Sequence, residues 1–234
     1  MKIAVMQPYF FPYIGYYQLV NAVEIFVFYD DVNYIKKGFV DRNSILLNGQ
    51  PFSFKVPCRS VSQNKRINEI EIDMDQFISW KNKFSKTLEA AYKKAPYYNE
   101  ALELIMSVLD QNHLLISELA IKSIITTFEY LGLKTEFKSS SIQYTNSELD
   151  RADRLIDICK EENADDYINA AGGKRLYTKD YFRTRGINLY FIKSSTIEYP
   201  QYKNDFIAGL SMVDVLMFNN VRDIKNYLNQ FELE

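Results

Sequence analysis

The sequence predicts an α/β protein, with a Rossmann-like, mostly parallel sheet flanked by helices and with a helical insertion. Short apolar runs such as KIAVM (2–6) and EIFVFYDDV (24–32) have the composition of strands buried on both faces. A helical pattern, IGYYQLVNAV (14–23), separates them, and so compact a strand–helix–strand unit favours a right-handed crossover. Strand and helix patterns alternate again after residue 132. We therefore expect one α/β domain over residues 1–234, in which residues 76–132 form a helical insertion or a helical layer on the sheet.

The middle of the chain carries signals for a hairpin and for helices. Ser44–Leu47 and Phe52–Val56 flank the turn dipeptide Asn48-Gly49, which predicts a β-hairpin. INEIEIDM (67–74) alternates apolar and polar residues, as a half-exposed strand does. Helical periodicity then continues to Gly132, which is expected to end the last of these helices.

The second half is expected to resume the α/β alternation. Strands are predicted at TEFKSSS (135–141), DYINA (166–170) and NLYFIK (188–193), the last strand of the chain. Helices are predicted at NSELDRADRLIDICKEENA (146–164), YTKDYFRTRG (177–186), LSMVDVLMFNN (210–220) and VRDIKNYLNQF (221–231). Ser211 and Asp214 have the spacing of a capping box with Asp in place of Glu.

Composition excludes several classes of function. The net charge of −2 makes a nucleic-acid partner unexpected, and two distant cysteines, Cys58 and Cys159, indicate reduced thiols in a cytoplasmic protein. No stretch has the length of a membrane span. A single histidine, His113, expected at the surface or near a helix start, argues against Ser-His-Asp triads and histidine zinc sites. We expect no haem, flavin, zinc or other protein-bound metal.

The loop after the first strand has the features of a binding site. Gln7 to Gly15 contains two prolines, which stiffen it, and Gly15 would let an anion approach the start of the following helix. Tyr9, Tyr13 and Tyr16 are candidates for stacking on a base or a sugar. In the alternative interpretation, the aromatic residues of this loop pack against neighbouring loops.

Charged residues follow the second strand in YDDVNYIKKGFVDRN (29–43). Asp30 and Asp31 could bind or deprotonate an amine, or hold Mg²⁺. Two lysines, Lys36 and Lys37, could meet phosphates, and Arg42 suits bidentate recognition of a carboxylate or phosphate. A solvated charged loop is the alternative.

A third candidate is NAAGGKR (169–175), which follows a predicted strand. Its two glycines and the lysine after them are typical of a phosphate nest, although the spacing is not that of a P-loop. Ligands of open α/β sheets bind beyond the carboxyl ends of the strands, where all three candidate segments are expected to lie. The expected catalytic residues are Asp30, Asp31 and Lys174, and the expected binding residues are Gln7, Tyr9, Tyr13, Gly15, Tyr16, Lys36, Lys37, Arg42, Asn43, Gly172 and Gly173.

Four blocks in order, QPYFFPYIGYYQLV (7–20), FVFYDDVNYIKKGFVDRN (26–43), YINAAGGKRLY (167–177) and LSMVDVLMFN (210–219), resemble the WbqC-like protein family. The resemblance implies a bacterial protein of O-antigen, that is lipopolysaccharide, or other surface-polysaccharide biosynthesis. It also implies a glycine transferase acting on an amino sugar, an activity proposed for a member of the family.

A more remote resemblance concerns the H-x-G-H turn of the nucleotidyltransferase and pantothenate-synthetase superfamily. Tyr13-Ile14-Gly15-Tyr16 stands where that motif would lie, with both histidines replaced by tyrosine. A phenol can hydrogen-bond a phosphate but lacks the imidazolium charge, so lysines would have to supply it. This likeness implies ATP, with Mg²⁺, as the source of activation.

These observations together predict a nucleotide-dependent aminoacyl transferase that forms an amide between glycine and a nucleotide-linked amino sugar. The donor is either activated by ATP through an adenylate or supplied preformed as an activated aminoacyl group. One alternative is a non-catalytic nucleotide- or sugar-binding or scaffolding protein of a polysaccharide assembly complex. Another is a metal-dependent glycosyltransferase that uses Asp30 and Asp31 as an acidic pair.

Overall fold

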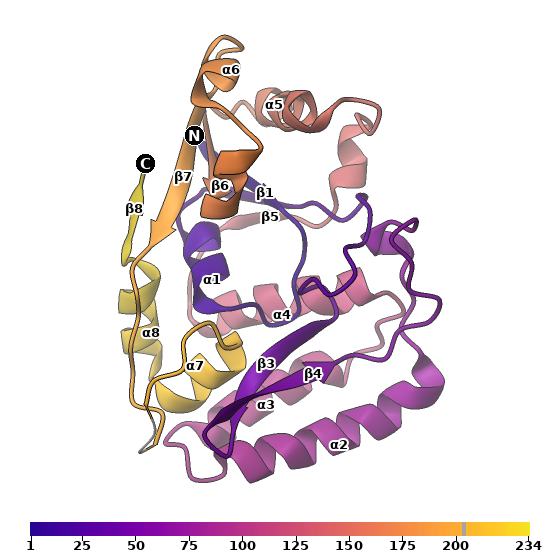
Figure 1. The fold of residues 1–234 in the computed structure, drawn as a ribbon, viewed down its shortest axis with the longest axis vertical. Coiled ribbons are helices and arrows are strands. Elements are labelled where there is room, and N and C mark those ends of the chain that lie inside the picture. The colour runs from indigo at the N-terminus through magenta and orange to yellow at the C-terminus, as the bar shows by residue number, and fades with distance from the viewer. Residues whose placement is uncertain (203–204) are drawn as a thin grey trace.

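The computed structural model describes residues 1–202 and 205–234. Its main sheet has six strands in the order β5-β2-β1-β6-β7-β8, flanked by helices on both faces (Figure 1), so the Rossmann-like fold class is confirmed. The strands are β1 (Lys2–Met6), β2 (Ile25–Phe28), β5 (Glu136–Lys138), β6 (Asp166–Ala170), β7 (Asn188–Ser194) and β8 (Phe231–Leu233).

Parallel pairing joins the first five of these strands. Ile3 of β1 pairs with Ile25 on one side and with Tyr167 on the other, and all three side chains are buried. The apolar runs therefore form central strands covered on both faces. The prediction that NLYFIK is the last strand is wrong, because β8 follows it and pairs antiparallel with β7 at the edge of the sheet.

Alternate side chains of the central strands enter two separate cores. Ala4, Phe26 and Phe28 face α1 (Ile14–Asn21) and α4 (Ile116–Tyr130), while Ile3 and Val27 face the opposite layer. That second layer consists of α5 (Arg151–Glu161) and α6 (Lys179–Arg183). The period of two along each strand produces this division.

A second, two-stranded sheet and a helical block lie below the main sheet in Figure 1. The predicted hairpin is present as β3 (Arg42–Leu47) and β4 (Gln50–Lys55), and the predicted helical stretch forms α2 (Met74–Tyr92), α3 (Tyr98–Leu109) and α4. The chain ends with α7 (Met212–Phe218), α8 (Val221–Leu228) and β8. Within the described residues, no helix is both long and apolar enough to cross a bilayer.

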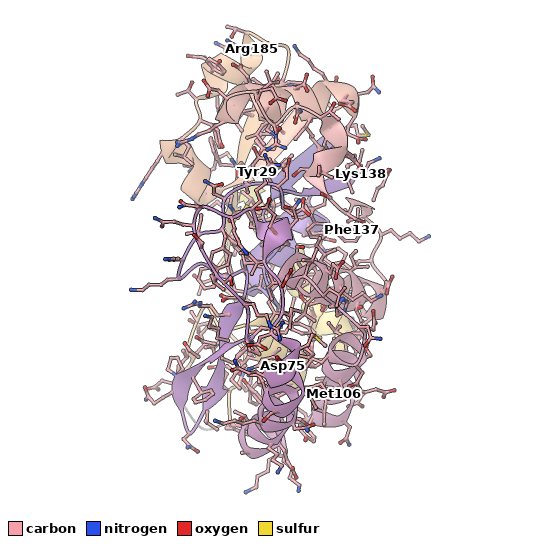
Figure 2. All side chains as sticks on the ribbon, turned by 90° about the vertical axis from the view of Figure 1, so that its right-hand side faces the viewer. Tyr29, Asp75, Met106, Phe137, Lys138 and Arg185 are labelled. Carbon is pink, nitrogen blue, oxygen red and sulfur yellow. The ribbon has the colours of Figure 1, made fainter. Side chains whose placement is uncertain are left out.

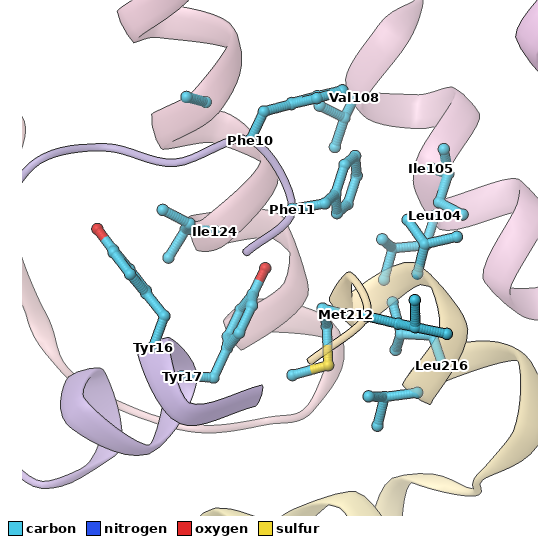
Figure 3. Close-up of a cluster of buried hydrophobic side chains, with 14 of the residues drawn as sticks. Phe10, Phe11, Tyr16, Tyr17, Leu104, Ile105, Val108, Ile124, Met212 and Leu216 are labelled. Carbon is cyan, nitrogen blue, oxygen red and sulfur yellow. The ribbon is translucent and has the colours of Figure 1, made fainter. Parts of the chain in front are cut away.

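The loop after β1 joins these parts. Phe10 and Phe11 are fully buried, and Figure 3 shows them between α3, α4 and α7, near Val108, Ile105 and Met212. Two of the four aromatic residues between Gln7 and Gly15 therefore belong to the core, as the packing interpretation predicts. The loop fixes the start of α1 relative to the helical block.

Three local predictions are corrected. INEIEIDM forms a 3₁₀ turn, η1 (Ile67–Glu69), and isolated bridges instead of a strand, and its three isoleucines are all buried in the core. The helix predicted from residue 146 begins at Arg151. Ser211 accepts a hydrogen bond from the Val213 N–H, but the Asp214 carboxylate is used by other side chains, so no reciprocal capping box forms.

Two sequence expectations about single residues have different outcomes. His113 is buried instead of lying at the surface, with Nε2 3.3 Å from the Val108 carbonyl oxygen, and burial lowers its pKa. Cys58 and Cys159 are both free thiols. Burial raises the pKa of each thiol to about 12, so both stay protonated at neutral pH.

Candidate functional site

The order of the parallel strands places a topological switch point between β1 and β6. From β1 the chain adds β2 and β5 on one side of the sheet, and then β6 and β7 on the other. The loop after β1 and the 3₁₀ turn after β6, η3 (Ala171–Arg175), therefore diverge at the carboxyl edge. Open α/β sheets bind ligands in the crevice at such a point.

The loop after β1 is held in a strained conformation by side chains from three other elements. Phe11 has φ 40°, a left-handed conformation that is unusual for an aromatic residue. Its N–H donates to Ser123 Oγ at 3.0 Å, and its carbonyl oxygen accepts from Asn43 Nδ2 at 2.7 Å and from Ser211 Oγ at 2.6 Å. Strain of this kind persists only where the surroundings over-determine it, and it is concentrated at functional sites.

The three candidate tyrosines differ in what they can offer a ligand. Tyr16 is buried, and its hydroxyl donates to the Gln7 carbonyl oxygen at 2.9 Å, so it braces the loop. Tyr9 and Tyr13 are half-buried, and their rings pack against Phe39 from the loop after β2. Burial raises the pKa of Tyr9 to about 12 and raises that of Tyr13, so both are neutral phenols at neutral pH.

Gly15 lies where α1 begins, directly beside β7. A Cβ added there would lie 2.7 Å from the Tyr13 ring and 3.1 Å from Ser194 Oγ. The N-cap residue Tyr13 makes no side-chain capping bond, although its carbonyl oxygen accepts from the Tyr16 N–H at 3.0 Å. Ser194, the last residue of β7, was not predicted; its place at a strand end was the available signal.

Asp30 and Asp31 follow β2 and are both buried, but their surroundings differ. Asp30 Oδ1 accepts from two neutral donors of the segment after β5, Ser140 Oγ at 2.6 Å and the Ser141 N–H at 3.2 Å. Burial raises the pKa of the Asp30 carboxyl, and the charge of Asp31 adds to the increase. Asp30 therefore binds a proton more readily than an ordinary aspartate.

Asp31 is neutralised by a buried arginine that the sequence interpretation missed. Arg154 Nη2 lies 2.6 Å from Asp31 Oδ2, and the two side chains are 5% and 2% exposed. The Ser141 hydroxyl donates to the other oxygen of Asp31, and the guanidinium lies 4.7 Å from the centre of the Tyr29 ring. Figure 2 shows Tyr29 near the height of Lys138, the last residue of β5.

The cationic candidates do not gather in one place. Lys36 and Lys37 are exposed on the loop after β2. Arg42 Nε is 3.0 Å from Asp41 Oδ1, the residue before it, and Asn43 is a buried brace of the loop after β1. These two residues have structural partners that the sequence could not indicate.

The glycines and lysine after β6 form η3. Gly172 is exposed, and a Cβ added there would have no atom within 4 Å. Gly173 lies against the Asn169 side chain, and a Cβ added to Gly173 would be 2.5 Å from Asn169 Nδ2. Lys174 forms an ion pair with Glu234, and its Nζ is 6.0 Å from the centre of the Phe191 ring. Lys174 would have to leave Glu234 to meet a phosphate.

The structure thus brings Tyr13, Gly15 and Ser194 together and attaches Asp30 and Asp31 to the segment after β5. Among residues 1–202 and 205–234, no group of three or more His, Cys, Asp or Glu side chains could hold a metal ion. Both oxygens of Asp31 already have partners, which makes the acidic pair a poor metal site on its own. A Mg²⁺ ion would therefore have to take most of its ligands from a bound phosphate and from water.

The strand order and its switch point define a Rossmann-like α/β protein whose candidate site lies at the carboxyl edge of the sheet. The sequence profile of the WbqC-like protein family matches residues 7–226, and the chain belongs to that family. A curated protein from Mycobacterium tuberculosis (strain ATCC 25618 / H37Rv), described as "Uncharacterized protein Rv1507c", is 25% identical over 230 residues, which cover 97% of each chain. No solved structure matches this chain.

Proposed function

We propose that the chain is a nucleotide-dependent transferase that forms an amide between glycine and the amine of a nucleotide-linked amino sugar in surface-polysaccharide biosynthesis. The observation that supports it most is the switch point, where the strained loop, Gly15 and Ser194 adjoin the start of α1. Family membership supports the setting of the reaction, and the resemblance to the H-x-G-H turn supports ATP as the source of activation.

The start of α1 would bind the phosphates of the nucleotide. N–H groups and the helix dipole favour an anion there. Gly15 itself is buried, and its missing Cβ makes room for the Tyr13 ring and Ser194 Oγ, whose hydroxyl groups would be the side-chain donors to the phosphate. Because Tyr13 is neutral, its hydroxyl can donate to a phosphate oxygen but supplies no charge. Lys174, released from Glu234, would supply the positive charge together with Lys36 and Lys37.

Asp30 is the candidate general base. In the first step the glycine carboxylate attacks the α-phosphate of ATP, which gives glycyl-adenylate and pyrophosphate. The acceptor amine then attacks the carbonyl carbon, a C–N bond forms, the C–O bond to AMP breaks, and Asp30 takes the proton released by the amine. The raised pKa of Asp30 suits this role, while Asp31, held by Arg154, is a positioning residue.

The direct test incubates the full chain with ATP, Mg²⁺, glycine and a nucleotide-linked amino sugar such as UDP-glucosamine, and follows products by mass spectrometry. We expect one glycyl group added to the amino sugar, together with AMP and pyrophosphate. Asp30→Asn should abolish the product, whereas Asp110→Asn, an exposed control at the end of α3, should leave it unchanged. Absence of product with a panel of amino sugars, despite saturable ATP binding, would refute the transferase.

One observation favours a second candidate, a binding or scaffolding protein without catalysis. Lys174 and Arg42 both form ion pairs with carboxylates of the chain itself, Glu234 and Asp41. Less positive charge is therefore available to a reacting phosphate. This candidate predicts saturable binding of the nucleotide-linked sugar in calorimetry, with no requirement for glycine and no product.

A further inference from the structure

A cavity of about 650 Å³ lies outside the carboxyl edge of the main sheet, at the tip of the hairpin. It is bounded by the β3–β4 turn and the last turns of α2, which Figure 1 places in the lower part of the molecule, and by Tyr202. Its lining residues are Leu46, Asn48, Gly49, Lys86, Glu89, Ala90, Ala91, Lys93, Lys94 and Tyr202. None of them belongs to the site described above.

The charge of this cavity is positive. Three lysines and one glutamate line it, and that glutamate, Glu89, is paired with Lys93 at 2.7 Å. Among the described residues, neither Lys86 nor Lys94 has a carboxylate within ion-pair distance. These two lysines therefore offer their charge to an anion from outside.

The cavity is also lined by an exposed aromatic ring held in a fixed orientation. Tyr202 has φ 57°, and its side chain stays 41% exposed. Its hydroxyl donates to the Ala91 carbonyl oxygen at 3.0 Å, and its ring packs edge-on against Phe218 with the ring centres 4.9 Å apart. A bulky residue in this left-handed conformation carries strain, and strain on an exposed, pre-oriented ring is typical of a binding site.

Two small residues of the lining leave room for a ligand. Ala90 and Ala91 place no long side chain there. The hairpin turn adds main-chain polar groups, because Asn48 and Gly49, at φ 52° and 73°, lie beyond the last ladder pair of Leu47 and Gln50. The cavity volume is in the range that small-molecule sites occupy.

We propose that this cavity binds a phosphorylated ring compound, with its phosphate on Lys86 and Lys94 and its ring on Tyr202. A sugar phosphate and a nucleotide share this chemistry. The proposal is independent of the transferase activity, because it uses other residues and another face of the molecule.

Calorimetry on the full chain tests the proposal with glucose 1-phosphate, UDP and inorganic pyrophosphate as probes. We expect Lys86→Gln/Lys94→Gln to weaken binding roughly tenfold or more, since a charge-assisted hydrogen bond contributes about 1.5–3 kcal/mol. The control Lys160→Gln/Arg222→Gln removes the same charge from exposed positions on α5 and α8 and should bind as the wild type does. Tyr202→Ala should weaken the ring-bearing probes but not pyrophosphate.

Of the two ring-bearing probes, the one that binds more tightly shows whether the natural ligand is a sugar phosphate or a nucleotide. Gly15→Val, which alters the switch point, should leave this binding intact and so separates it from the proposed transferase site. Equal losses in the two double variants, unchanged affinity in Lys86→Gln/Lys94→Gln, or loss of glucose 1-phosphate binding in Gly15→Val would each overturn the proposal. Circular dichroism melts of the variants check the fold, which these exposed lysines should not affect.

Discussion

Two neighbouring aspartates should respond in opposite ways to the same substitution. Asp31→Asn removes the negative charge 2.6 Å from Arg154 and leaves a guanidinium that is 5% exposed without its counter-charge. Breaking a buried ion pair from one side costs about 3–5 kcal/mol. The amide oxygen can still accept one of the two hydrogen bonds, so we expect the lower end, about 3 kcal/mol.

Asp30→Asn should not destabilise the protein at pH 7. Both donors to Asp30, Ser140 Oγ and the Ser141 N–H, bind the same oxygen, and an asparagine oxygen can accept from both. Burial raises the carboxyl pKa above 3.8, so the folded state binds this proton more tightly than the unfolded state does. Stability therefore falls as the pH rises from about 4 through the raised pKa, and the amide removes that loss.

Thermal melts at pH 4, 5.5 and 7 measure both effects. For a chain of this length, about 1 kcal/mol shifts the Tm by about 2–4 °C, so Asp31→Asn should lower the Tm at pH 7 by about 6–12 °C. The Tm of Asp30→Asn should equal or exceed that of the wild type, with a difference that grows from pH 4 to pH 7. The double variant Asp31→Asn/Arg154→Met should recover stability relative to Asp31→Asn. Equal destabilisation by the two single substitutions would refute the distinction between the aspartates.

Three further predictions follow from single contacts. Asn43→Ala removes hydrogen bonds to the Phe11 carbonyl and the Ser44 N–H. Urea unfolding should therefore show a free energy of unfolding lower by about 2–3 kcal/mol, and calorimetry should show weaker ATP binding. Asn64→Ala is the exposed control, and unchanged stability of Asn43→Ala would refute the bracing role. Asp214→Asn replaces a buried carboxylate that accepts from Tyr92, Tyr199 and Gln201, and the new amide N–H₂ would have to face one of those donors. Urea unfolding should therefore show a free energy of unfolding lower by about 2–4 kcal/mol. The control Asp205→Asn should have no such effect. Lys174→Ala should abolish turnover but change the Tm little, because its ion pair with Glu234 is half exposed; wild-type activity in this variant would remove Lys174 from the mechanism.

The sequence was informative where local pattern decides the structure. The apolar runs of β1, β2 and β6 and the Asn48-Gly49 turn are read from a few neighbouring residues, and each was predicted in place. INEIEIDM has the same alternation as a strand, but Ile67, Ile70 and Ile72 are all buried, so tertiary packing overrode the local pattern. The strand β8 was missed because its three residues pair only with the edge of β7.

The candidate site could be predicted only as a set of strand ends. That Asp30 and Asp31 follow a strand is visible in the sequence, but Arg154 lies 123 positions from Asp31 and is placed by the packing of α5. Likewise, nothing near Asn43 or Lys174 indicates that their partners are the Phe11 carbonyl and Glu234. Contacts between distant segments decide which polar residues are braces and which remain open to a ligand.

A crystal structure of the chain with a non-hydrolysable ATP analogue and Mg²⁺ tests the central claim most directly. We predict phosphate oxygens within hydrogen-bonding distance of the first N–H groups of α1, with the Tyr13 hydroxyl and Ser194 Oγ beside them. Phosphates bound elsewhere, with the start of α1 facing only solvent, would contradict the assignment of the nucleotide site to the switch point.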